Sequence, residues 1–198
     1  MTAKVIKTVS VLGVAATLSA CGGSGSTGGV PQAPQSFEQL EAQSAALLNK
    51  YRIDSINDPS TLRVTGSSDY AGVMTLHGED ARQFRVSGQM NLNVNFATNA
   101  VAGTVSNFVD LQETRYTGTL AIGRGSIDRA SNPDDAEPTF SAALNGVLTS
   151  ETTSLDIDGL MRGYFQGEDA AAVQGFLSGD LSVGSATVPL FGGFIGER

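Results

Sequence analysis

Hydrophobic and polar residues alternate strictly between residues 88 and 96. A period of two predicts a β-strand with one apolar face and one polar face. A turn-like break at residues 97–100 separates this strand from another apolar segment at 101–109, and the two segments predict a hairpin. The apolar positions of the first strand are Met90, Leu92, Val94 and Phe96.

Similar segments recur along the rest of the chain. About eight strands, separated by Gly, Asn, Asp and Ser, suit a small closed antiparallel barrel, whose interior holds side chains or one small ligand. We therefore predict a mainly β fold: an eight-stranded antiparallel β-barrel preceded by one N-terminal α-helix. The further predicted strands are residues 70–76, 116–123, 140–149, 154–165, 172–183 and 188–195.

The acidic stretch at residues 128–138 is the least strand-like part of this region, and we predict a solvated loop that forms the variable contact surface. A membrane-spanning barrel would need an apolar outer band with aromatic girdles. The chain has no tryptophan and few other aromatic residues, which favours a soluble barrel with an apolar interior. Glycines inside the strands are expected at tight curvature or close backbone approach, namely Gly88, Gly103, Gly118, Gly146 and Gly159.

The segment before the strands has helical spacing. Ser36 and Gln39 form a capping-box pattern, which predicts a helix over residues 36–50. We expect its narrow apolar stripe to dock on the barrel, and a partner-binding helix is the alternative. The stripe consists of Phe37, Leu40, Leu47, Leu48 and Tyr51.

The N-terminus has the layout of a bacterial secretory signal, with Lys4 and Lys7 followed by a short uncharged apolar run. The run ends in Leu-Ser-Ala-Cys at Cys21, which resembles the lipobox of bacterial lipoproteins and implies lipid attachment to Cys21. Gly22 replaces the aspartate that retains sorted lipoproteins in the inner membrane, which implies the outer membrane. We predict a signal peptide at 1–20, a flexible tether at 21–35, helix and connector at 36–60, and barrel at 61–198.

Charge and cysteine usage exclude several functions. The chain has 12 basic and 20 acidic residues, and removal of the signal peptide leaves ten basic residues and a net charge of −10. Nucleic-acid binding needs a basic face, so we expect none. Because Cys21 is the only cysteine, the mature fold can contain neither an internal disulfide nor a cysteine nucleophile.

Two stretches resemble the barrel domains of transferrin-binding protein B. Residues 62–73 are similar to the opening of these domains, through Gly66-Ser67 and the Tyr-x-Gly that begins at Tyr70. Residues 155–175 are similar to the family pattern of Gly-x-Phe-Tyr-Gly, an acidic-alanine turn and Gly-Gly, although Gln174 replaces the first glycine of that pair. The resemblance implies a single eight-stranded barrel on a surface lipoprotein without the family's handle domain. Iron or haem acquisition is a family-level expectation.

Candidate chemical groups are sparse. His77 could be a ligand, but we interpret it as a surface residue at a strand end, and Met74, Met90 and Met161 as core rather than a ligand cavity. The loop carboxylates Asp134, Asp135 and Glu137 lack the glycine of a calcium loop, and Asp156 and Asp158 share one strand face that we expect to point outward. A nucleophile elbow of the form G-x-S-x-G is missing from the sequence.

These observations predict an outer-membrane lipoprotein that is not an enzyme, needs no cofactor, and binds a protein partner or small ligand. We expect the protein to contact the membrane through the lipid on Cys21. The alternative is a structural envelope lipoprotein that docks on a membrane protein through its N-terminal helix. The sequence identifies neither the ligand nor the oligomeric state.

Overall fold

The computed structural model describes residues 35–52, 56–78 and 84–198. The predicted signal peptide, Cys21 and almost all of the predicted tether lie outside the described residues. No helix within the described ranges has the length and apolar character needed to cross a membrane.

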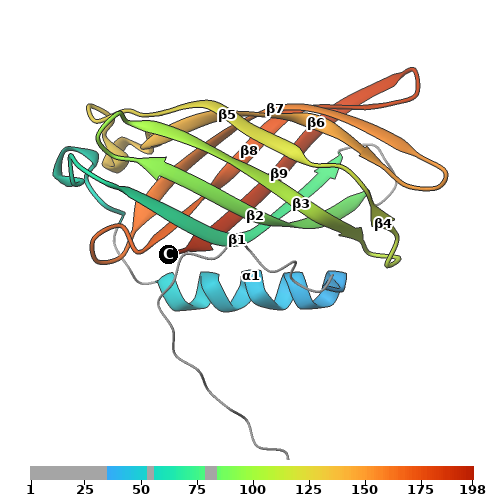
Figure 1. Ribbon diagram of the computed structural model, residues 1–198, viewed down its shortest axis with the longest axis horizontal. Helices are drawn as coiled ribbons and strands as arrows, with labels where there is room; N and C mark the ends of the chain where they lie inside the picture. Colours follow the sequence, from blue (N-terminus) through green and yellow to red (C-terminus); the bar gives the residue numbers. More distant parts are fainter. Residues whose placement is uncertain (1–34, 53–55, 79–83) are drawn as a thin grey trace, which may run out of the picture. The chain divides into compact units, whose positions relative to one another are not determined.

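Eight long strands form a closed antiparallel barrel (Figure 1). Strands that follow one another along the barrel chain pair in order, and the last strand pairs with the first, so the barrel is an up-and-down meander. This confirms the predicted fold class. The strands are β1 (Ser67–Gly78), β2 (Arg85–Asn95), β3 (Ala100–Asp110), β5 (Leu120–Ile127), β6 (Phe140–Thr149), β7 (Ser154–Gln166), β8 (Ala172–Val183) and β9 (Ala186–Glu197).

The predicted strand at residues 116–123 is divided in the structure. A two-residue strand, β4 (Arg115–Tyr116), pairs with β3, and β5 begins only at Leu120. Between them Gly118 has a φ of +115°, and a Cβ at this position would lie 2.2 Å from the carbonyl oxygen of Val147. The interruption therefore follows from a glycine conformation that an apolar–polar pattern does not reveal.

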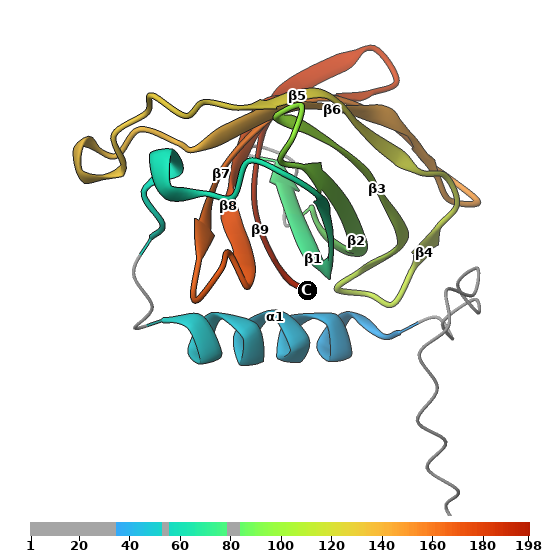
Figure 2. The same cartoon turned by 60° about the vertical axis from the view of Figure 1, so that its left-hand side comes forward.

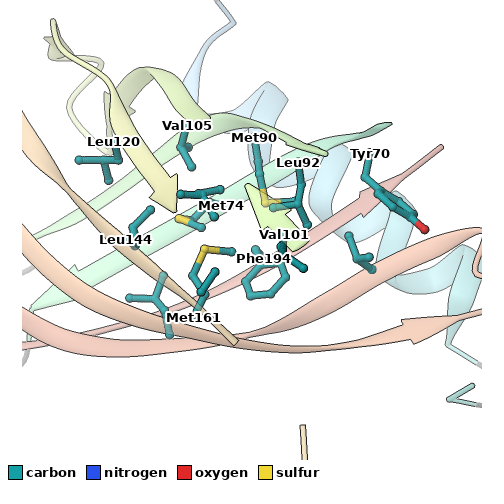
Figure 3. Close-up of a cluster of buried hydrophobic side chains, with 14 of the residues drawn as sticks. Tyr70, Met74, Met90, Leu92, Val101, Val105, Leu120, Leu144, Met161 and Phe194 are labelled. Carbon is teal, nitrogen blue, oxygen red and sulfur yellow. The ribbon is translucent and has the colours of Figure 1, made fainter. Parts of the chain in front are cut away.

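The barrel interior is filled by side chains (Figure 3). Tyr70, Phe96, Phe140, Phe165 and Phe194 form a continuous aromatic cluster with ring centroids 5.3 to 6.2 Å apart. The buried core also contains three methionines, Met74, Met90 and Met161. They are core residues, as predicted. A small barrel can enclose either side chains or one small ligand, and in this barrel side chains occupy the interior.

Glycines make room for the aromatic rings inside the barrel. A Cβ at Gly88 would lie 2.7 Å from the ring of Phe108, and one at Gly175 would lie 2.7 Å from the ring of Phe194. A bulge supports the first contact: Asn107, with a φ of +56°, shifts the register of β3 against β2. Gly88 thus makes room for a ring, whereas the expected close backbone approach is confirmed at Gly103, Gly118 and Gly146, where a Cβ would lie 2.2 to 2.6 Å from a carbonyl oxygen.

Helix α1 (Phe37–Tyr51) lies on the outside of the barrel wall, where it contacts β1, β2 and β9 (Figure 2). Its capping box is present, since Ser36 Oγ accepts from the Gln39 amide and the Gln39 side chain accepts from the Ser36 amide. The helix docks on the barrel as predicted. The prediction that Leu48 belongs to the docked stripe is wrong. Its side chain remains 46% exposed, because it follows buried Leu47 and points to the side of the stripe.

Residues 128–139 connect β5 to β6 and include a short 3₁₀ turn, η2 (Pro133–Asp135). Arg129 fixes the start of this loop, because its guanidinium donates to the side chain of Asn99 and to main-chain carbonyls that include those of Leu62, Arg63 and Phe96. The predicted loop is confirmed, but its first residues are anchored to the connector before β1.

Candidate functional site

The candidate residues from the sequence are dispersed in the structure. His77 is exposed near the end of β1, as predicted, with its ring 6.1 Å from that of Phe191. The loop residues Asp134, Asp135 and Glu137 are exposed, and so are Asp156 and Asp158 on the outer face of β7. Within the described ranges, no three histidine, cysteine or acidic side chains are grouped so as to hold a metal ion.

A hollow lies on the outside of the barrel, beside the middle of α1. This groove has a volume of about 440 Å³. Leu48 of α1 and Phe176 of β8 contribute apolar walls, and Gly193 of β9 belongs to its floor. We call it the α1 groove.

The α1 groove exists because small residues face each other at the centre of the helix–barrel contact. At one end Phe37 and Leu40 pack on the barrel, and at the other end Leu47 and Tyr51 do so. The middle position of the stripe is Ser44, which lines the groove together with Gly193 of β9. A Cβ at Gly193 would contact only the Gly175 carbonyl, at 3.7 Å, so space above Gly193 is open.

Glu41 forms a polar attachment at one end of the α1 groove. One oxygen of its half-buried carboxylate accepts hydrogen bonds from the hydroxyls of Thr75 and Ser87, both 2.8 Å long. The other oxygen pairs with the guanidinium of Arg85. Both oxygens are therefore occupied by groups of the barrel wall, and we assign Glu41 to holding α1 in place rather than to proton transfer.

A second polar attachment holds the C-terminal end of α1. Lys50 Nζ lies 2.5 Å from the carboxylate of Glu197, and the Tyr51 hydroxyl donates to the same carboxylate. The hydrogen bond from Lys50 holds the pKa of Glu197 below its ordinary value, whereas burial raises the pKa of Tyr51. The two attachments keep α1 across the barrel wall while the groove between them stays open.

Two exposed apolar side chains, Leu48 and Phe176, line the α1 groove, and a third, Phe191, adjoins Phe176. Leu48, Phe176 and Phe191 are 46, 44 and 40% exposed, and we call them the apolar patch. Phe176 is paired with Gly193, and Phe191 lies two residues before Gly193 on β9, so the two rings are diagonal neighbours on adjacent strands. Exposed apolar surface that adjoins a groove is typical of an interaction site.

A row of carboxylates follows the apolar patch along the same barrel face. Asp158 of β7 and Asp180 of β8 are directly opposite each other, and Asp156 lies two residues before Asp158. All three are exposed, and none of them takes part in an ion pair with another described residue. Like charges at opposite positions of a strand pair are destabilising, so the repulsion between Asp158 and Asp180 lowers the stability of the fold.

The α1 groove was not predicted, because the residues that line it come from segments far apart in the sequence. The sequence did contain one signal, a serine at position 44 inside an otherwise apolar helical stripe. The opposition of Asp158 and Asp180 likewise depends on the register of β7 and β8, which is set only in the folded barrel.

Comparison with known proteins gives no assignment. No protein-family model matches the chain, and no curated protein matches it either.

Proposed function

We propose that this chain is a lipid-anchored, non-enzymatic binding protein of the bacterial outer membrane that recognises its partner through the outside of its barrel. The observation that carries the binding role is the pair formed by the α1 groove and the apolar patch. The groove and the patch offer a surface for non-covalent binding, and the carboxylate of Glu41 is already occupied by barrel residues. This arrangement suits binding better than a chemical reaction.

The packed interior directs the proposal to the outer surface. Phe140 and Phe165 lie with centroids 5.3 Å apart in the middle of the aromatic cluster, and Met74 and Met161 are fully buried. Protein interiors of this kind are close-packed, and a ligand would have to displace these side chains. The α1 groove offers space without any such displacement.

The outward side chains support a barrel that faces water. Asn91 and Asn93 of β2 are exposed, as are Asp156, Asp158 and Asp180 of β7 and β8. Barrels that span outer membranes place apolar residues outward and polar residues inward. This chain has the reverse arrangement, which favours an anchored domain over a spanning one.

The proposals of a lipid anchor and of a family relationship are based on the sequence. The lipobox-like end of the apolar run at Cys21, followed by a Gly/Ser-rich segment, supports a lipidated tether. We further propose that the chain is a single-barrel relative of the transferrin-binding protein B barrels, which fits the eight-stranded meander. The proposal does not extend to iron or haem, because His77 stands outside the groove, beside Phe191.

The alternative of a structural lipoprotein that docks through α1 has less support. Phe37, Leu40, Leu47 and Tyr51 are all buried against the barrel, so the apolar stripe of the helix is already used within the chain. A partner could reach the rim of the helix at Leu48, which belongs to the apolar patch of the favoured proposal.

Expression of the full chain in a Gram-negative host tests the anchor. Mass spectrometry of the N-terminal peptide is expected to show cleavage before Cys21 and acyl groups on it, and Cys21→Ser is expected to abolish both. Protease treatment of intact cells then tells whether the barrel faces outward or toward the periplasm. A mature protein with an unmodified Cys21 would contradict the anchor.

A further inference from the structure

We propose that the α1 groove and the apolar patch dock a cationic, apolar peptide segment of another protein. The inference rests on the proposed binding role and adds the chemistry of the partner. It is independent of lipidation at Cys21, so the two can fail separately.

The apolar part of the segment is defined by the groove. An aliphatic or aromatic side chain that enters above Gly193 would contact Leu48 on one side and Phe176 on the other. The open space above Gly193 accepts such a side chain without movement of the barrel wall. Apolar side chains that fill a preformed hollow are the usual source of affinity in interfaces.

The charge of the segment is defined by the carboxylate row. Asp180 lies four residues from Phe176 on the same face of β8, a distance of about 13 Å along an extended strand. Asp158 and Asp156 extend the row on β7, and Arg162 is the cationic neighbour, opposite Phe176. Lysine or arginine residues beside the apolar side chain would relieve the repulsion between Asp158 and Asp180.

The same charges select against other occupants. A second copy placed on this face would bring its own carboxylate row toward Asp156, Asp158 and Asp180. An anionic lipid surface or a fatty acid would meet this row and a chain of net charge −8. The Arg85 guanidinium is already paired with Glu41, and the single cation Arg162, opposite Phe176, does not balance three carboxylates. A cationic segment is the occupant that complements both the patch and the row.

Fluorescence titration with three synthetic peptides tests the proposal on the full-length chain. The first peptide contains lysine, leucine and phenylalanine, the second has glutamate in place of each lysine, and the third has serine in place of each apolar residue. We expect saturable binding of the first peptide alone, weakened by salt. Equal binding of the glutamate or the serine peptide would overturn the proposal.

Matched variants locate the site. F176S combined with F191S is expected to weaken binding at least about tenfold. Gly193→Leu fills the groove and is expected to do the same, whereas Gly123→Leu adds the same side chain at another open strand glycine and should leave binding unchanged. Circular dichroism establishes that each variant is folded.

The carboxylate row has its own control. D158N combined with D180N is expected to weaken binding by about three- to tenfold and to reduce its salt dependence. D134N combined with D135N removes the same charge from the exposed η2 turn and should have no such effect. An equal loss in both double variants would show general attraction to an acidic protein and would overturn the site. So would a dimer of the wild-type chain that F176S dissociates, because the patch would then serve a second copy.

Discussion

The barrel interior and the α1 groove use glycine in opposite ways. Inside, Gly88 and Gly175 lie under aromatic rings, so the missing side chain is replaced by Phe108 and Phe194. Outside, Gly193 lies under the middle of α1, and Ser44 is too small to fill the space. The same residue type therefore lets side chains fill the interior and leaves the groove on the outside open.

The largest expected effect comes from adding side chains at two neighbouring glycines. In Gly175→Val the new Cβ would collide with the carbonyl of Arg162 and the ring of Phe194, so we expect a loss of at least about 4 kcal/mol in the free energy of unfolding. Gly193→Ala should change it by less than about 0.5 kcal/mol. Urea unfolding measures both. Equal effects would contradict the distinction between a filled interior and an open groove.

Truncation of aromatic side chains gives the second contrast. Phe165 contacts three rings of the aromatic cluster, and Phe165→Ala should cost about 3–5 kcal/mol of stability. Phe176→Ala removes an exposed ring from the apolar patch and should cost less than about 1 kcal/mol. Thermal unfolding of the two variants decides this. A strong loss at Phe176 would mean that the patch supports the fold rather than a partner.

Alkaline unfolding reports on the closed interior. Burial raises the pKa of Tyr70 to about 12, and its hydroxyl donates to the carbonyl of Ala170. Because the pKa is higher in the folded state than the ordinary value of about 10, the contribution of Tyr70 is complete below pH 10. It is lost as the pH rises toward 12, and it amounts to something on the order of 2 kcal/mol. Tyr70→Phe should remove this part of the pH dependence. A wild-type curve identical to that of the variant would show that Tyr70 is accessible to water.

The smallest expected effect concerns the polar attachment of α1. Glu41→Ala removes the acceptor of Thr75, Ser87 and Arg85 and should cost about 1–2 kcal/mol. Hydrogen exchange is expected to speed up in α1 and to stay unchanged in β6. Unchanged exchange in α1 would show that its apolar stripe alone holds the helix.

Most of the fold could be predicted, because period-two patterning and capping act within short segments. Residues 140–149 and 172–183 were predicted with the bounds that β6 and β8 have, and the capping box placed the start of α1. The break before Leu120 was missed because it depends on a positive φ at Gly118. The α1 groove and the opposed Asp158 and Asp180 were missed because they arise from contacts between segments distant in sequence.

Methyl-resolved NMR of the chain during titration with the lysine, leucine and phenylalanine peptide tests the central claim most directly. We expect shifts at Leu48 and Ile195, which line the α1 groove, and unchanged signals at Leu92 and Ile157 inside the barrel. Shifts at Leu92 and Ile157 with none at Leu48 would place the ligand inside the barrel and contradict the account.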